Sequence, residues 1–106
     1  MASLTVSVVS DSDCMKFILE GRIDASNAYY FSDALSAALI GYTGGKIVFE
    51  CRKLEYISSA GLRELLRLWK RRKLAVKLEN VTHEVESIMN MTGFSQFFEI
   101  SGGIQQ

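Results

Sequence analysis

The first twenty residues alternate between hydrophobic and polar or small side chains. The apolar positions of the two alternating runs are Leu4, Val6 and Val8, then Met15, Phe17 and Leu19. A polar turn at residues 11–13, Asp-Ser-Asp, separates the two runs. A period of two residues is typical of strands with one buried face, so this region predicts a β-hairpin.

The hydrophobic spacing changes after residue 24 from strand-like to helical. The cluster Asp24, Ser26 and Asn27 consists of residue types that cap helix N-termini. The apolar positions that follow are Ala28, Phe31, Leu35, Ala38 and Leu39. This spacing predicts a helix from about residue 26 to residue 40, ending at Gly41.

Two further patterns lie in the middle of the chain. Residues Ile47, Val48, Phe49 and Cys51 form a nearly continuous apolar run. Such a run is typical of a central strand covered on both faces. An i, i+3, i+4, i+7 stripe then predicts a second amphipathic helix that continues towards Lys73. The stripe consists of Leu62, Leu65, Leu66 and Trp69.

The C-terminal third predicts a strand at 74–78, a helix at 82–92 and a last strand at 97–100, followed by a flexible tail at 101–106. Gly93 followed by Phe94 indicates a glycine C-cap with an apolar contact behind it. Alternating strands and helices predict the α/β class. The expected architecture is a mixed, largely parallel sheet of about five strands packed against helices.

Composition limits the classes of function. A chain of 106 residues, 48% of them hydrophobic, suits a single domain over residues 1–106. With 12 basic and 12 acidic side chains, no global charge favours direct binding to nucleic acid or to a membrane. Without a basic leader or a long apolar stretch, we expect a cytoplasmic monomer that does not insert into membranes. Cys14 and Cys51 are expected to be reduced packing residues.

The chain offers little for catalysis or metal binding. His83 is the single histidine, and it lies far in sequence from the serines discussed below. We therefore expect no enzyme activity, no metal site and no cofactor. Met89 and Met91 are expected to fill the core. A basic run from Arg63 to Lys73 is interpreted as a solvated helix face, with the steering of an acidic partner as the main functional alternative.

The segment Tyr-Ile-Ser-Ser-Ala-Gly-Leu-Arg at residues 56–63 holds two hydroxyls where a strand becomes a helix. With Ser58 as the N-cap, Ile57 and Leu62 occupy the two positions of a hydrophobic staple. With Ser59 as the cap, the second position would be Arg63, which staples poorly. We therefore assign capping to Ser58 and the freer hydroxyl to Ser59.

A phosphate on Ser59 would lie at the positive end of the helix dipole, four residues before Arg63. The folded domain should tolerate it. A partner packed over this surface would meet roughly −1.5 to −2 added charge, so phosphorylation could switch binding off. The small residues Ala60 and Gly61 would admit a partner's backbone, or they reflect tight internal packing.

At these residues the sequence resembles the STAS domain family, in particular the bacterial anti-sigma factor antagonists. The resemblance covers nearly the whole chain. It is carried by residues 19–24 (Leu-Glu-Gly-Arg-Ile-Asp), the strand at 47–51, the segment at 56–63 and the Met-Thr-Gly-Phe at 91–94. In that family the serine segment often reads Asp-Ser-Ser-Gly-Leu. Alignment on Gly61 and Leu62 places Ser58 at the aspartate, Ser59 at the phosphorylated serine and Ala60 at the second serine.

The resemblance implies partner switching. The unphosphorylated domain would bind an anti-sigma factor that is also a serine kinase, and a sigma factor would be released. Phosphorylation of Ser59 would reverse this binding, and a PP2C-type phosphatase would reset the cycle. Ser58 remains an alternate acceptor. The implied partner-binding residues are Asp24, Ser26, Asn27, Ser58, Ser59, Ala60, Gly61, Leu62 and Arg63.

Two alternatives stay open. The serines and the Asp24 cluster have a purely structural interpretation as helix caps. Within the same family, the chain could also be a scaffold or adaptor subunit of a signalling complex, or of a lipid or anion transport system, without a sigma-factor role.

Overall fold

The computed structural model describes residues 3–72 and 75–102, which form five strands, three α-helices and one short 3₁₀ helix. In chain order the elements are β1 (Leu4–Ser10), β2 (Cys14–Ile23), α1 (Ala28–Leu39), β3 (Lys46–Ile57), α2 (Ser59–Arg72), β4 (Ala75–Val81), α3 (His83–Thr92), η1 (Phe94–Gln96) and β5 (Glu99–Gly102).

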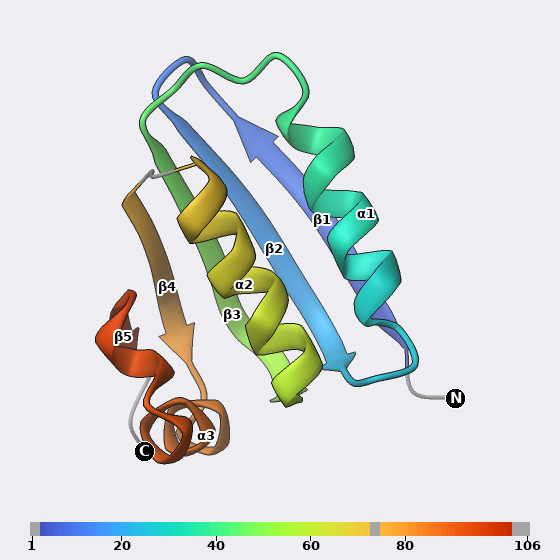
Figure 1. The fold of residues 1–106 in the computed structure, drawn as a ribbon, viewed down its shortest axis with the longest axis vertical. Coiled ribbons are helices and arrows are strands. Elements are labelled where there is room, and N and C mark those ends of the chain that lie inside the picture. Colours follow the sequence, from blue (N-terminus) through green and yellow to red (C-terminus); the bar gives the residue numbers. More distant parts are fainter. Residues whose placement is uncertain (1–2, 73–74, 103–106) are drawn as a thin grey trace.

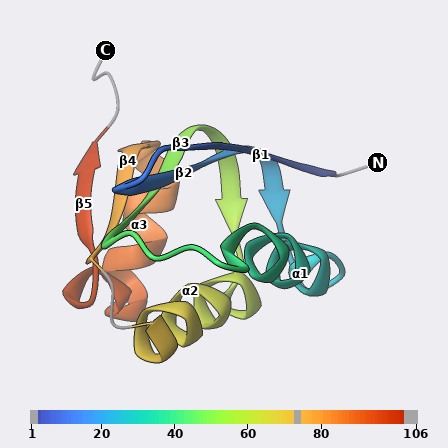
Figure 2. The ribbon, with the colours of Figure 1, turned by 90° about the horizontal axis from the view of Figure 1, so that it is seen from above.

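The strands follow one another across a single sheet in the order β1-β2-β3-β4-β5. The hairpin β1–β2 is antiparallel and the remaining pairs are parallel, which confirms the predicted mixed, largely parallel sheet. Each crossover moves one strand in the same direction. Because such crossovers are right-handed, all of them place their helices on the same face. Figures 1 and 2 show α1, α2 and α3 on one side of the sheet.

The prediction for the apolar run at 47–51 is half right. Its strand, β3, is central, but helices cover only one of its faces. On the helix side, the Phe49 ring lies 5.2 Å from the Phe17 ring and 6.1 Å from the Phe31 ring of α1. Val48 points to the other face and is still only 3% exposed. Its register neighbours are Lys16 and Lys77, whose aliphatic stems can shield it while their charges remain in water.

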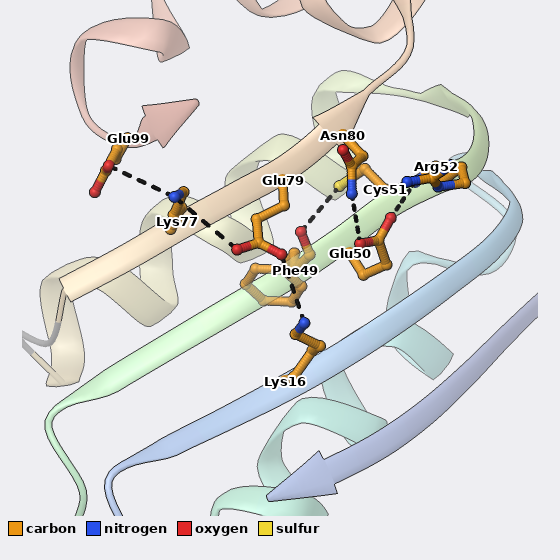
Figure 3. A network of polar contacts seen from close by, with 9 residues as sticks. All are labelled: Lys16, Phe49, Glu50, Cys51, Arg52, Lys77, Glu79, Asn80 and Glu99. Carbon is orange, nitrogen blue, oxygen red and sulfur yellow. Dashed lines mark hydrogen bonds and ion pairs between the residues drawn. The ribbon is translucent and has the colours of Figure 1, made fainter. Parts of the chain in front are cut away.

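The uncovered face carries a polar network that extends across four strands, from β2 to β5 (Figure 3). The Glu79 carboxylate of β4 lies 3.5 Å from the Lys16 ammonium of β2 and 3.9 Å from that of Lys77. Lys77 also lies 3.8 Å from Glu99 of β5. These charges explain how a mostly parallel sheet leaves one face to solvent, since parallel sheets usually have both faces covered.

The boundaries of α1 and α3 agree closely with the sequence pattern, but three strands differ from it. β3 continues to Ile57 instead of ending at residue 51, and β4 continues to Val81 instead of ending at residue 78. The predicted strand at 97–100 begins instead at Glu99, because the chain first makes the 3₁₀ turn η1. The predicted tail is wrong for Ser101 and Gly102, which belong to β5, and its remaining positions lie outside the described residues. Gly93 has φ 79° at the end of α3, which confirms the predicted glycine cap.

Two packing predictions need correction on the helices. Met91 is 82% exposed, whereas Met89 is fully buried. Two residues along a helix correspond to about 200° of rotation, so the two methionines cannot share one face. On α2 the buried positions are Leu62, Leu65 and Leu68, with Leu66 and Trp69 only partly covered. The predicted continuation to Lys73 and the strand start at residue 74 lie outside the described residues.

Both cysteines are free thiols. Cys51 is fully buried beneath the helices, and this burial raises the pKa of its thiol above the ordinary range. Cys14 is partly covered at the start of β2. Among the described helices, none combines the length and apolar character that a membrane crossing requires.

Candidate partner-binding site

The predicted site forms where β2 and β3 end, at the carboxyl edge of the parallel strands. Ile23 and Ile57 are register partners at these two strand ends. One residue further on, the Ser58 N–H donates a hydrogen bond of 2.8 Å to the Ile23 carbonyl. The loop before α1 and the start of α2 are therefore held side by side, although 34 residues separate Asp24 from Ser58 in the chain (Figure 1).

Ser58 is the capping residue of α2, as the staple argument predicts. Its Oγ accepts a hydrogen bond of 3.3 Å from the Gly61 N–H. Its carbonyl accepts the first helical bond from the Leu62 N–H at 2.9 Å. The staple residues Ile57 and Leu62 are both buried, at 1% and 0% exposure. Ser58 is thus held through its N–H, its carbonyl and its hydroxyl.

Ser59 is the first residue of α2 and lies exposed on the surface. Among the described residues, its hydroxyl has no hydrogen-bond partner. It is therefore the more accessible of the two serines. Arg63, four residues further along the helix, is also exposed and has no acidic partner among the residues that the structure covers. The first turn of α2 contains no acidic residue. A negative charge on Ser59 would therefore lie near the positive helix N-terminus and the Arg63 guanidinium, with no carboxylate of that turn to repel it.

Gly61 and Leu62 have internal roles. A Cβ atom on Gly61 would lie 2.7 Å from Ile23 Cγ2 and 2.8 Å from Ile57 Cγ1, closer than real Cβ contacts. Glycine at this position therefore lets α2 pack against the strand ends. The Leu62 side chain is fully buried in the core. Of the two small residues Ala60 and Gly61, Ala60 is partly exposed and Gly61 is buried.

The Asp24 loop is built by its own side chains. Asp24 Oδ1 accepts hydrogen bonds from Ser26 Oγ at 2.6 Å, from the Ser26 N–H at 2.9 Å and from the Asn27 N–H at 3.2 Å. Asn27 closes the loop by accepting from the Asp24 N–H and by donating to the Arg22 carbonyl, both at 2.9 Å. Asn27 also stands at the N-cap position of α1, without a side-chain bond into the helix. Asp24 and Asn27 are half-buried, while Ser26 is exposed.

These bonds stabilise the charged form of Asp24. The hydroxyl of Ser26 is the main cause that lowers the pKa of this carboxyl below its ordinary value, and the backbone N–H groups of Ser26 and Asn27 add to the effect. Asp24 is consequently an anion at neutral pH, and one of its carboxylate oxygens, Oδ1, accepts the three hydrogen bonds that shape the loop.

The sequence pattern did not single out one contact at this edge. The Arg22 guanidinium lies 4.6 Å from the centre of the Tyr56 ring, in a cation–π arrangement across β2 and β3. Arg22 and Tyr56 are register partners, and each stands two residues before its loop. If β2 and β3 are aligned in parallel so that Asp24 and Ser58 follow their ends at the same level, Arg22 and Tyr56 become neighbours. This alignment would have located the contact from sequence.

The described residues contain no group of three or more histidine, cysteine or acidic side chains placed to hold a metal ion. His83 is exposed at the first position of α3. This edge carries the N-termini of α1 and α2 and the exposed side chains of Ser26, Ser59 and Arg63.

Comparison with known proteins places this geometry in a family. The STAS domain model matches residues 5–106. The chain belongs to the STAS domain family. Among solved structures, an anti-sigma factor antagonist from Mycobacterium paratuberculosis shares the fold with a TM-score of 0.81 at 18% identity, covering 92% of this chain and 85% of that one.

Two further STAS-like structures agree with this fold. The anti-sigma factor antagonist SpoIIAA in its unphosphorylated form gives a TM-score of 0.72 at 15% identity, covering 93% of this chain and 88% of that one. RsbS from Moorella thermoacetica gives 0.71 at 20% identity, covering 94% and 88%. At these identities the likeness establishes the STAS fold and its topology.

Proposed function

We propose that this STAS domain is an anti-sigma factor antagonist that acts by partner switching. Its unphosphorylated form binds an anti-sigma factor serine kinase, so that a sigma factor is released. Phosphorylation of Ser59 abolishes the binding, and a PP2C-type phosphatase restores it. In this role the domain is a substrate and a binding module in the cytoplasm, acts as a monomer and carries out no catalysis of its own.

The observation that carries the proposal is the different state of the two serines. Ser58 Oγ is engaged at the N-cap, whereas the exposed Ser59 hydroxyl has no partner among the described residues. A kinase can phosphorylate only a hydroxyl that it can reach, so Ser59 is the acceptor and Ser58 the alternate. The fold is shared with SpoIIAA, which is known in unphosphorylated and phosphorylated forms.

The proposed contact surface combines the two segments that the Ser58–Ile23 hydrogen bond joins. Its accessible members are Ser26, Ser59 and Arg63, with Asp24, Asn27, Ser58 and Ala60 partly covered. Gly61 and Leu62 support this surface from beneath. A phosphate at its centre would have to be desolvated by any partner packed over it, which favours loss of binding over unfolding.

The test uses candidate anti-sigma factor kinases from the organism's own genome. Each is incubated with the domain and ATP, and the modified residue is mapped by mass spectrometry. We expect phosphate on Ser59 and none in Ser59→Ala, which should still bind the kinase. Ser59→Asp should fold but fail to bind. Ser12→Asp is the matched control, because it adds the same charge in the hairpin turn at the far end of the sheet.

Two results together would contradict the proposal: no kinase modifies Ser59 or Ser58, and Ser59→Asp binds every partner as tightly as the wild type. If phosphate appears on Ser58 instead, the assignment of the acceptor is wrong while partner switching stands. If Ser12→Asp weakens binding as much as Ser59→Asp, the contact surface is misplaced.

A further inference from the structure

A groove with a volume of about 220 Å³ lies between α1 and α2 and is lined by residues of both helices. The two helices lie side by side in both views of the fold. Their lining positions are spaced at i, i+3, i+4 and i+7 on each helix. They are Ser32, Leu35, Ser36 and Leu39 on α1, and Glu64, Arg67, Leu68 and Arg71 on α2. The groove is separate from the serine site but begins about one helical turn from it.

The groove has an apolar floor and polar walls. Leu35 and Leu68 are 4% and 9% exposed, so they form the base. Ser32 and Ser36 stand on the α1 wall, and their hydroxyls have no hydrogen-bond partner among the described residues. A ligand can therefore place an apolar side chain against leucine and a polar group against serine.

The charge of the groove is unbalanced. Among the described residues, two guanidinium groups line it and one carboxylate, that of Glu64. Arg67 forms an ion pair with this carboxylate, with a distance of 2.7 Å between Arg67 Nη1 and Glu64 Oε2. Arg71 is exposed and has no acidic partner in the described parts of the chain. Because Arg67 is paired with Glu64, Arg71 gives this wall a net positive charge.

The dimensions select the kind of occupant. Seven residues of helix separate the first and last lining positions on each side, which corresponds to a length of about 10 Å. This length matches about two turns of an α-helix. An amphipathic helix could place apolar residues at i and i+4 on the leucine floor and carboxylates against Arg67 and Arg71. A neutral apolar occupant would leave the guanidinium of Arg71 facing it without a partner.

We infer that the groove between α1 and α2 is a docking site for an acidic amphipathic helix of a protein partner. Because Leu35 and Leu68 are already buried in the domain, they shape the floor of the groove and add little contact area. The attraction comes mainly from Arg71 and Arg67, which select for negative charge. This site is additional to the proposed serine switch and does not depend on it, because none of its lining residues belongs to the switch surface.

The probe is a helix-forming peptide of four turns with leucines at i and i+4, flanked by glutamates. Binding to the full chain is followed by ¹⁵N chemical shifts. We expect shifts concentrated at residues 32–39 and 64–71. Arg71→Gln should weaken binding about tenfold, as for loss of a charged hydrogen bond. Arg52→Gln, which removes the same charge from β3, should leave the affinity within about twofold.

Two further arms separate specific docking from general attraction. The same peptide with every glutamate replaced by glutamine should bind at least about tenfold more weakly. Ser36→Glu, at an exposed position, should reduce binding to a similar extent by repelling the peptide. The inference is overturned if the glutamine peptide binds equally well, if Arg52→Gln and Arg71→Gln have equal effects, or if the shifts fall around Ser59 and Asp24 alone. None of these results bears on whether a kinase modifies Ser59.

Discussion

Ser58 and Ser59 are neighbours with the same side chain, but only Ser58 uses its hydroxyl inside the fold. The Ser58 backbone bonds to the end of β2 and to Leu62 in α2, which orients its Oγ towards the Gly61 N–H. Ser59 is one residue further along the helix, and its side chain points to solvent. At the residue scale, this one-position difference separates a structural serine from an accessible one.

The two serines should therefore respond differently to removal of the hydroxyl. Ser58→Ala loses the N-cap and should lower the free energy of unfolding by about 1 kcal/mol. Ser59→Ala should change it by less than about 0.5 kcal/mol. Urea-induced unfolding of the two variants measures the difference. A larger loss for Ser59→Ala would mean that the capping assignment is reversed.

Gly61 gives a second prediction at this scale. In Gly61→Ala the new methyl group would press on two buried isoleucines at 2.7 and 2.8 Å. Overpacking costs about 1–3 kcal/mol, which exceeds the small helix-propensity gain of alanine in a first turn. We expect a net loss of about 1–2 kcal/mol in the free energy of unfolding, measured by urea denaturation.

Gly45→Ala is the matched control, because a Cβ atom there has no neighbour within 4 Å. This variant should be as stable as the wild type or slightly more stable. Equal losses in the two variants would show that packing around Gly61 is not the cause.

At the scale of the element, the N-terminus of α2 has a charge deficit. Its first turn contains no acidic residue, while Arg63 follows in the second turn. The first turn therefore supplies no negative charge to the positive end of the helix dipole, which is capped by the neutral Ser58 hydroxyl. A negative group at Ser59 should be favourable to the helix, and the switch can add charge without damaging the domain.

Ser59→Asp tests this directly. The new carboxylate should raise the free energy of unfolding by about 0.3–1 kcal/mol at low salt. In 1 M salt the screening length falls to about 3 Å, so the gain should shrink. Ser59→Asn is the neutral control of the same shape and should show no salt-dependent gain. Urea denaturation at two salt concentrations measures both, and destabilisation by aspartate alone would contradict the dipole argument.

At the scale of the whole molecule, stability comes from one side of the sheet. The helix side buries the aromatic stack of Phe17 and Phe49, whereas the open side carries exposed or half-exposed ion pairs around Glu79. Buried apolar area is worth far more than such pairs, which are hydrated and screened. The network of Figure 3 therefore keeps the open face hydrated and its charges paired across the strands, and it contributes little to the total stability.

Two substitutions compare the faces. Phe49→Ala should lower the free energy of unfolding by about 3–5 kcal/mol because it leaves a cavity under α1. Glu79→Gln removes the carboxylate that two lysines share and should cost less than about 1 kcal/mol. Thermal and urea unfolding measure both. A loss for Glu79→Gln that approaches that of Phe49→Ala would show that the open face is covered by something that excludes water.

The sequence by itself determined what depends on neighbours within a few residues. Hydrophobic periods identified the five strands and the three α-helices, although not η1 or the full length of β3. The staple positions Ile57 and Leu62 assigned the cap to Ser58. These properties are local because a cap or a helix face is formed by residues within about one or two turns.

The tertiary structure decided what depends on residues far apart in the chain. The apolar run at 47–51 predicted two covered faces, but Val48 is shielded by lysines of the neighbouring strands. The close contact between Gly61 and Ile23, the hydrogen bond between Ser58 and Ile23, and the groove between α1 and α2 all arise from the crossover order. Strand register and helix placement bring these residues together, and no local pattern encodes either.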